Sequence, residues 1–191
     1  MSDPSMLNDL GEIGTWIDQS LTRGAVDARH AFHWPTLGTI AADGTPSLRT
    51  VVLRKFDPSE HRLLIYTDRR SEKAVEISGD QRVSIHLYDP RTKVQLRLHG
   101  LAALHTEGPV WADAWSRAEQ GPLFDYSQSP PPGTVIDGPD ACAAEGADPG
   151  ETFAVIAVDR KSTEYLRLSR QGHRRALFTH GDDGKSVWLA P

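Results

Sequence analysis

Two short segments of this sequence place cationic side chains where proteins commonly bind anions. In Arg49-Thr50-Val51-Val52-Leu53-Arg54-Lys55, three cations flank β-branched residues that favour a strand. In Tyr66-Thr67-Asp68-Arg69-Arg70-Ser71-Glu72-Lys73, hydroxyls and a lysine lie where a strand leads into a helix. Free N–H groups at a helix start, a hydroxyl and a lysine together can bind a phosphate. On local pattern alone, solvated strand ends and a helix capped by Ser71 explain both segments as well.

A third segment, Val94-Gln95-Leu96-Arg97-Leu98-His99-Gly100, alternates apolar and polar residues. This alternation predicts a strand with one apolar and one polar face. The amide of Gln95 offers both a donor and an acceptor, which could bind the edge of a heterocycle. A solvent-facing strand surface is the alternative reading of the same pattern.

Several other kinds of site have no support in the sequence. No GxGxxG, GxxxxGK[ST] or GxSxG motif is present, which argues against the nucleotide-binding and hydrolase sites that need them. His30 and His33 are three residues apart but lack an HExxH motif or paired cysteines, so a packing or surface role is favoured over a metal site. Cys142, the single cysteine, has no fixed histidine partner and is not expected to be a nucleophile.

The composition fits one globular domain that spans residues 1–191. Of the 191 residues, 38% are hydrophobic and 25% are charged, and the net charge is -5. An acidic balance argues against general nucleic-acid binding, and no apolar run approaches the roughly 20 residues of a membrane helix. The start of the sequence lacks the basic and apolar stretches of a signal peptide. We therefore expect a cytoplasmic protein that binds neither nucleic acid nor membrane.

Two periodicities predict the elements that position these residues. Apolar residues at helical spacing predict an N-terminal helix at about 6–23, with Ser5 as its cap and Gly24 just past its end. Shorter helices are expected at 71–78, with Ser71 as N-cap, and near 110–119. Strands are expected at 36–42, 47–57, 61–67, 83–88, 93–105, 152–158, 163–168 and 176–179, with 187–189 as a further strand.

Residues 121–151 are rich in Gly, Pro, Asp and Ala and predict a long loop. Hairpin turns such as Asp43-Gly44 separate most of the expected strands. Six to eight short strands of this kind indicate a mainly β fold, an antiparallel barrel with flanking helices.

The order and spacing of the motifs resemble those of the pyridoxamine 5'-phosphate oxidase family. The resemblance covers roughly residues 30–191 and includes the closing Trp188-Leu189-Ala190-Pro191. It implies an FMN-binding split β-barrel and a homodimer with flavin at the subunit interface. Such a protein is an oxidoreductase in which FMN carries the redox step.

The resemblance also implies roles for particular residues. Arg49 and Lys73 would bind the FMN phosphate, with help from Ser71, and Thr50, Val51, Val52 and Leu53 would line the isoalloxazine ring. The other flavin contacts that it implies come from Tyr66 and Thr67 and, across the interface, from Gln95, Gln128 and Ser129. No catalytic side chain is required beyond the flavin, and no metal is expected.

The positions that would contact substrate depart from the family pattern. Arg54 replaces a lysine, Asp113 replaces a tyrosine and Gly121 replaces a serine, whereas Arg117 keeps the arginine for substrate phosphate. Leu166 and Leu177 stand where the family has a flavin-contacting tryptophan and arginine. The pocket candidates for a small anionic substrate are Arg54, Arg117, His173 and Arg175, for which solvated surface charge is the alternative.

Three functions fit this pattern. The favoured one is an FMN-dependent oxidoreductase of the family with a substrate that the sequence does not name. The second is a genuine pyridoxamine 5'-phosphate oxidase that makes pyridoxal 5'-phosphate, which Arg117 supports and Asp113, Gly121 and Leu177 oppose. The third is a flavin carrier or sensor without turnover.

Overall fold

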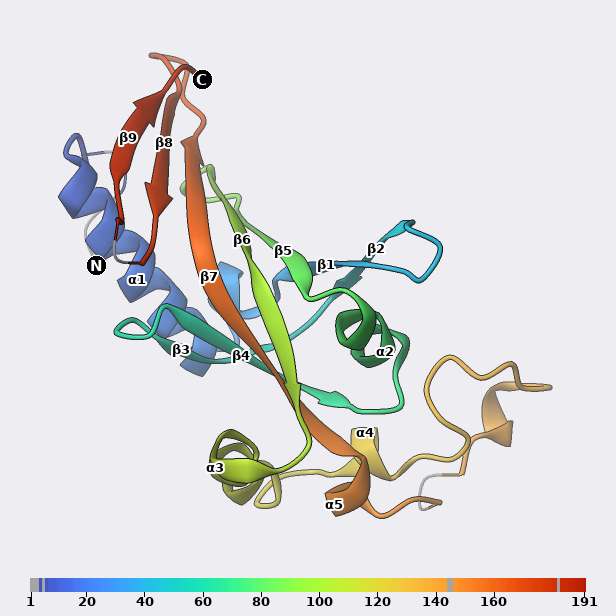
Figure 1. Cartoon of the computed structure of the whole chain (residues 1–191). Helices are drawn as coiled ribbons and strands as arrows, with labels where there is room; N and C mark the ends of the chain where they lie inside the picture. The colour runs from blue at the N-terminus through green and yellow to red at the C-terminus, as the bar shows by residue number, and fades with distance from the viewer. Residues whose placement is uncertain (1–3, 5, 144–145, 182) are drawn as a thin grey trace.

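The structure is a computed structural model, and it describes residues 4, 6–143, 146–181 and 183–191. One antiparallel sheet dominates it, with helices around the sheet (Figure 1). The strands are β1 (Thr36–Ile40), β2 (Pro46–Thr50), β3 (Leu53–Asp57), β4 (Arg62–Asp68), β5 (Arg82–Asp89), β6 (Val94–His105), β7 (Phe153–Arg167), β8 (Arg174–Thr179) and β9 (Ser186–Leu189). The helices are α1 (Leu10–Val26), η1 (Ala31–His33), α2 (Glu72–Gly79), α3 (Gly108–Ala118), α4 (Phe124–Ser127), η2 (Pro139–Ala141) and α5 (Pro149–Thr152).

The sheet closes on itself. Its strand order is β2-β1-β5-β6-β7-β4-β3, so β2 and β3 are at the two edges. Yet only Val51 and Val52 separate these two strands in the chain. An extended chain spans about 3.3–3.6 Å per residue, so the two edges must lie within roughly 11 Å of each other. The predicted strand 47–57 is therefore wrong as one strand, because the chain leaves one edge of the sheet and joins the other.

β7 is the strand on which the sheet splits. β6 pairs with β7 along nearly its whole length. On the other side of β7, β4 pairs with the first half and β8 with the second half. β8 then continues to β9, which leaves the C-terminal hairpin as a separate wing of the sheet. The expected antiparallel split barrel is confirmed, with nine strands in place of six to eight.

The sequence predicted a break in β7 at Asp159-Arg160-Lys161-Ser162, and that prediction is wrong. The strand continues through this polar run because the charge of the buried Arg160 is compensated: its Nη2 lies 2.8 Å from Oδ1 of Asp18 on α1. The ladder only shifts its register here, between His99 and Gly100 of β6. A Cβ at Gly100 would lie 2.5 Å from the main-chain oxygen of Asp159, so the close approach of the two strands requires glycine.

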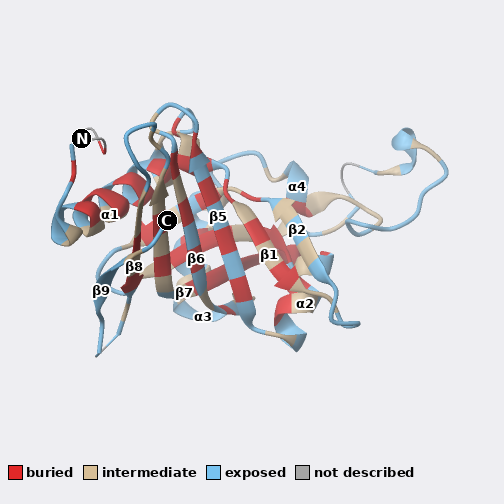
Figure 2. Cartoon of the chain, turned by 90° about the horizontal axis from the view of Figure 1, so that it is seen from above, coloured by how far each residue is buried: buried red, intermediate tan, exposed pale blue. Residues whose placement is uncertain are grey.

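The main core lies between α1 and the inner face of the sheet. Figure 2 shows the buried face of α1 turned toward the strands. Ile13 and Leu21 are fully buried there. The helix begins later and ends later than predicted, because Asp9 caps it by accepting hydrogen bonds from Gly11 and Glu12. Ser5, the predicted cap, lies outside the described residues.

A second, smaller core lies on the outer face of the sheet, under α3. Trp111 and Trp115 stack with ring centroids 5.6 Å apart, and both rings lie close to Phe153 at the start of β7. Ala114 of α3 is buried in the same cluster. This packing holds α3 over one end of the outer face, as the lower part of Figure 1 shows.

The remaining expectations agree with the structure in outline. The helix at 71–78 is α2 and the helix near 110–119 is α3, each shifted by one or two residues. The 121–151 segment is mostly irregular, although it includes α4, η2 and the start of α5. Among the described residues, no helix is long and apolar enough to cross a membrane.

Candidate functional site

Arg49 is fixed at the junction of β2 and α2. Its Nη2 donates to Oε2 of Glu76 at 2.8 Å and to Oγ of Ser47 at 2.6 Å, and its Nη1 donates to Oγ1 of Thr39. Thr39 in turn donates to the same Glu76 carboxylate at 2.6 Å. The side chain of Arg49 is therefore held in one position, as a ligand-binding arginine must be.

Lys73 lies one helical turn before Glu76 on α2, and it is half-buried. Burial lowers the pKa of Lys73, and the positive charge of Arg49 lowers it further. Within the described part of the chain, the ammonium group has no hydrogen bond and no ion pair. The carboxylates of Asp68, Glu76 and Glu72 attract the ammonium group without pairing with it, so a bound anion could supply a direct partner.

Ser71 and Thr67 form a buried pair of hydroxyls at the start of α2. Their oxygens lie 3.1 Å apart, and Ser71 Oγ donates to the carbonyl of Asp68 at 2.7 Å. Ser71 is the N-cap residue, as predicted, but its side chain makes no capping hydrogen bond. Its donor is thus used within the turn, and a ligand could meet only an oxygen acceptor or the free N–H groups of the helix.

The segment between β2 and β3 follows Arg49 directly in the chain. Thr50 is exposed, Val52 is half-buried, and Val51 and Leu53 are buried in the main core. The main-chain N–H of Val51 donates to the carbonyl of Pro35 at 2.9 Å. Residues 51 and 52 belong to neither edge strand, so this is a place where a flat ring could meet the main chain.

Arg54 is displaced by a bulge, because the β3–β4 register shifts between Leu53 and Lys55. The sequence alone left open where Arg54 points, and the structure places its guanidinium carbon 5.6 Å from the ring centroid of Tyr66. The Tyr66 ring also packs edge-on against Phe153, at 5.1 Å. Burial raises the pKa of Tyr66, and the charges of Arg117 and Arg54 oppose that rise. Arg54, Tyr66 and Arg117 are thus neighbours.

Asp113 joins two cations in this group. Its carboxylate accepts from Nη2 of Arg117 at 2.7 Å and lies 3.4 Å from Nζ of Lys55. All three side chains are partly exposed. Sequence reasoning placed Asp113 and Arg117 in this region, named Lys55 only as a cation of the 49–55 segment, and missed Glu76 beside Arg49. The spacing of Lys73 and Glu76 by three residues was the available signal, because it places them on one helix face.

A second group of predicted residues lies at the other end of the sheet, on its outer face. Gln95 of β6 pairs with Leu166 of β7, which in turn pairs with Arg175 of β8. Arg175 Nη2 lies 3.0 Å from Glu164 Oε2, which also accepts from Arg97 at 2.6 Å. Burial would raise the pKa of Glu164, but the two arginines outweigh it and lower that pKa.

His173 and the loop pair lie apart from these groups. His173 is exposed, and its Nδ1 accepts from the main-chain N–H of Ser169 at 3.1 Å. The carbonyl of Gln128 accepts from Arg70 at 2.9 Å, and Ser129 exchanges two main-chain hydrogen bonds with Ala143. The single chain therefore divides the predicted residues among several places. Arg117 lies on α3 and Arg54 lies near it beside Tyr66, whereas His173 and Arg175 lie at the opposite end of the sheet, where β8 begins (Figure 1).

The residues that sequence reasoning set aside have structural roles. His30 Nδ1 accepts from the main-chain N–H of Phe32 at 3.2 Å, and His33 Nδ1 lies 2.6 Å from the carbonyl of Gly24. Both histidines are buried. Cys142 is a free, half-buried cysteine in the irregular segment.

Comparison with known proteins gives a consistent result. A family model described as the pyridoxamine 5'-phosphate oxidase, FMN-binding domain matches residues 14–106. That segment contains Arg49, Lys73 and Gln95 and ends before Arg117. Pyridoxine/pyridoxamine 5'-phosphate oxidase 2 of Arabidopsis thaliana is 36% identical over 188 residues, covering 90% of this chain and 93% of that protein.

Bacterial relatives match over a shorter stretch. Pyridoxine/pyridoxamine 5'-phosphate oxidase of Rubrobacter xylanophilus is 31% identical over 96 residues, which cover 50% of this chain and 42% of that protein. The match thus spans less than half the length of this bacterial relative.

Solved structures share the fold. A pyridoxamine 5'-phosphate oxidase-related, FMN binding protein from Nostoc punctiforme has a TM-score of 0.72 and 23% identity, over 93% of this chain and 96% of that chain. PhzG from Burkholderia lata, in complex with tetrahydrophenazine-1-carboxylic acid, has a TM-score of 0.69 and 20% identity, over 95% of this chain and 91% of that chain.

Proposed function

Because this chain belongs to the pyridoxamine 5'-phosphate oxidase family of FMN-binding proteins, we propose that it is an FMN-dependent oxidoreductase acting on a small anionic substrate. FMN is the cofactor of the family domain that the chain contains. When bound, FMN supplies the ring nitrogen that accepts a hydride, so the protein needs no nucleophilic side chain of its own. The protein's part is to bind and orient FMN and the substrate and to polarise them.

The observation that carries the proposal is the unpaired charge of Lys73. This lysine is half-buried near Arg49, and within the described residues it makes no ion pair, although the carboxylates of Asp68, Glu76 and Glu72 attract it from a distance. A phosphate dianion between Lys73 and Arg49 would supply a direct partner. The free N–H groups at the start of α2 would add to the attraction, since Ser71 does not cap them with its side chain.

The ring end of the flavin would lie along the link between β2 and β3. Thr50, Val51, Val52 and Leu53 would line it with main-chain groups, close to Tyr66 and Thr67 on β4. We propose that Gln95, Gln128 and Ser129 of a second copy complete this site in a homodimer. The position of Gln95 on an outer face that α3 does not cover supports this part of the proposal.

The substrate pocket would contain cations from both copies. Arg54 and Arg117 lie beside Tyr66 in one chain, whereas His173 and Arg175 lie at the opposite end of the sheet. A two-fold axis can bring opposite ends of two copies together. We propose that these four residues then face one anionic substrate.

Turnover of pyridoxamine 5'-phosphate is the second candidate function. The Arabidopsis thaliana relative carries the name of that activity, and Arg117 holds the position of a substrate-phosphate arginine. Against it, Arg117 is already paired with Asp113 at 2.7 Å, and Gly121 offers no hydroxyl. We therefore favour a different anionic substrate.

A redox titration of the FMN-loaded protein tests the proposal. We expect NADH, NADPH or an anionic amine to bleach the flavin absorption without oxygen, and oxygen or a quinone to restore it. The Arg54→Met variant should keep its FMN and show a raised KM, while Lys185→Met, on the exposed β8–β9 turn, should behave as the unmodified protein. Holoprotein that no donor bleaches would contradict an oxidoreductase and favour a flavin carrier or sensor.

A further inference from the structure

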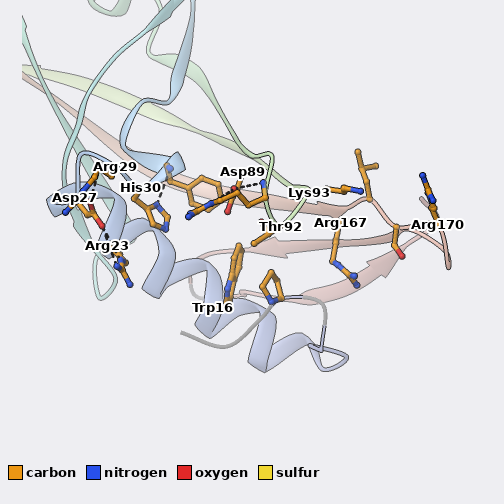
Figure 3. A pocket seen from close by; sticks show the side chains of 15 residues that line it. Trp16, Arg23, Asp27, Arg29, His30, Asp89, Thr92, Lys93, Arg167 and Arg170 are labelled. Atoms are coloured by element: carbon orange, nitrogen blue, oxygen red, sulfur yellow. Dashed lines mark hydrogen bonds and ion pairs between the residues drawn. The ribbon is translucent and has the colours of Figure 1, made fainter.

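A cationic cavity of about 860 Å³ lies beneath the end of α1, away from Arg49 and Lys73. Its walls come from α1, η1, the β5–β6 turn and the β7–β8 turn (Figure 3). Among the described residues, two carboxylates line it, those of Asp27 and Asp89. Six cationic side chains line it as well: Arg23, Arg29, Arg91, Lys93, Arg167 and Arg170. The cations therefore outnumber the carboxylates by four, in a chain whose net charge is -5.

The acidic residues of the cavity neutralise its cations only in part. Arg23 lies 3.5 Å from Asp27, and Arg91 lies 3.5 Å from Asp89, which are long ion pairs. Across the described ranges, the side chains of Lys93 and Arg170 take part in no hydrogen bond or ion pair. Figure 3 shows both on the turns that border the cavity.

Two buried hydrogen-bonding atoms of the same cavity lack partners. Trp16 is 4% exposed, and its indole Nε1 has no hydrogen-bond partner among the described residues. The Oγ1 atom of Thr92 is also buried and without a partner in that part of the chain. Both residues line the cavity, and both are labelled in Figure 3. An unsatisfied buried donor costs free energy, which a ligand that accepted from either atom would recover.

The cavity is on the opposite side of the sheet from Gln95. Side chains alternate along a strand, so the partner of the buried Val94, which is Arg167, points to the same face as Val94, under α1. Gln95 and its partner Leu166 point to the other face. The main-chain N–H of Ser169, which lines the cavity, donates to His173, but His173 itself does not line it. The cavity is thus separate from the flavin contacts proposed above.

We propose that this cavity is a second ligand site, which binds a small organic phosphate with at least two negative charges. Lys93 and Arg170 would bind the phosphate groups at the entrance, and Thr92 and Trp16 would donate to it on the inner wall. The volume falls in the range of about 300–1,000 Å³ typical of sites for small molecules and cofactors, which is more than inorganic phosphate fills. The inference does not depend on which substrate the flavin site takes.

Calorimetric titration of the FMN-loaded protein with ADP and with inorganic pyrophosphate tests this site, because bound FMN keeps the flavin site filled. We expect one site per chain for each probe, with ADP binding more tightly than pyrophosphate. Raising the NaCl concentration from about 0.05 to about 0.5 M should weaken both, since the contacts are ionic. The Lys93→Glu and Arg170→Glu variants should lose affinity by at least about tenfold. Lys185→Glu, the matched change on the β8–β9 turn, should leave both affinities unchanged.

The Thr92→Val variant separates ligand binding from folding. Valine keeps the shape of threonine but removes the unpartnered hydroxyl, so the free energy of unfolding should stay constant or increase. Its affinity for ADP should fall by about tenfold, as expected for a lost hydrogen bond to a charged group. The proposal is overturned if neither probe binds at about 10 mM, well above ordinary ligand affinities. Binding that Lys93→Glu, Arg170→Glu and Thr92→Val leave intact would also overturn it, and ADP no tighter than pyrophosphate would rule out an organic ligand.

Discussion

Arg49 on β2 donates to Glu76 on α2 across 2.8 Å, and this ion pair ties the edge of the barrel to the helix that carries Lys73. Glu76 forms its ion pair with Arg49, and its carboxylate attracts Lys73 without an ion pair to it. The lysine therefore keeps its positive charge next to an arginine that cannot move away. Burial and this neighbour lower the pKa of Lys73, which an incoming phosphate would reverse.

The first prediction is that the protein binds FMN more tightly than riboflavin, which lacks the phosphate. A charge-assisted contact contributes roughly 1.5–3 kcal/mol, so the affinities should differ by about ten- to a hundredfold. Quenching of flavin fluorescence measures both. In Lys73→Met the preference should nearly vanish, while the free energy of unfolding of the flavin-free protein should not fall, because an unpaired half-buried charge is removed.

Lys185→Met is the matched control, since Lys185 is exposed on the β8–β9 turn. It should keep the full preference for FMN. Equal affinities for FMN and riboflavin in the unmodified protein would refute the phosphate contacts of Arg49 and Lys73.

The second prediction is that each flavin site contains residues of two chains. Lys73→Met and Gln95→Ala homodimers should each bind FMN weakly. If the two are unfolded together and refolded, a mixed dimer has one site in which both residues are intact. Random pairing should then restore tight FMN binding at about a quarter of the sites.

Counting tight sites by flavin fluorescence before and after mixing gives the answer. A site built within one chain would recover none, because every chain still carries a substitution. Sedimentation of the unmodified protein should show a dimer whose dissociation on dilution releases FMN.

The third prediction concerns stability at acid pH and the half-buried pair His61 and His180, whose ring centroids are 4.4 Å apart. Burial, together with the charges of Arg160 and His61, lowers the pKa of His180 from 6.5 to about 3. The folded protein thus binds fewer protons than the unfolded chain between these values. The contribution of His180 to the free energy of unfolding should be complete above pH 6.5 and should decrease as the pH falls toward 3. The slope of this decrease corresponds to the uptake of at most about one proton on unfolding.

Urea unfolding at a series of pH values measures this slope. The His180→Gln variant should flatten the profile below pH 6.5, whereas His86→Gln, an exposed histidine on β5, should leave it unchanged. An identical slope in His180→Gln would show that other groups cause the acid sensitivity.

Hydrophobic periodicity and turn residues were enough to predict the class of fold. They failed where a polar run stays in a strand: residues 159–162 look like a turn, but Asp18 from a distant helix compensates the buried Arg160. They also failed at Val51 and Val52, where a continuous β-branched run connects opposite edges of the sheet. Both errors have the same origin, because long-range pairing decides what a local pattern becomes.

The candidate site was predictable as a set of residue types and not as an arrangement. The resemblance to the family grouped Arg49, Ser71 and Lys73, but it did not show that Glu76 holds Arg49 or that the Ser71 hydroxyl is used within its turn. Arg54 could not be placed because a bulge sets its direction. The cationic cavity under α1 was not predicted from the sequence, because its cations come from four separate segments.

The last prediction is that pyridoxamine 5'-phosphate is a poor substrate. Of the residues expected around its phosphate, Arg117 is paired with Asp113 at 2.7 Å, and Gly121 supplies no hydroxyl. The phosphate would have to displace the Asp113 carboxylate, which repels it, from both Arg117 and Lys55. A lost contact and a nearby like charge together cost several kcal/mol, or at least roughly a hundredfold in kcat/KM at about 1.4 kcal/mol per decade.

In Asp113→Asn the repulsion disappears and Arg117 is released, so kcat/KM for pyridoxamine 5'-phosphate should rise by about tenfold or more. Asp125→Asn, the same change at an exposed position of α4, should have no effect. Formation of pyridoxal 5'-phosphate at saturating oxygen measures the rate. If the unmodified protein turns over at about one per second or faster, the low end of ordinary enzymes, then other groups bind the phosphate and the chain is an oxidase of pyridoxamine 5'-phosphate.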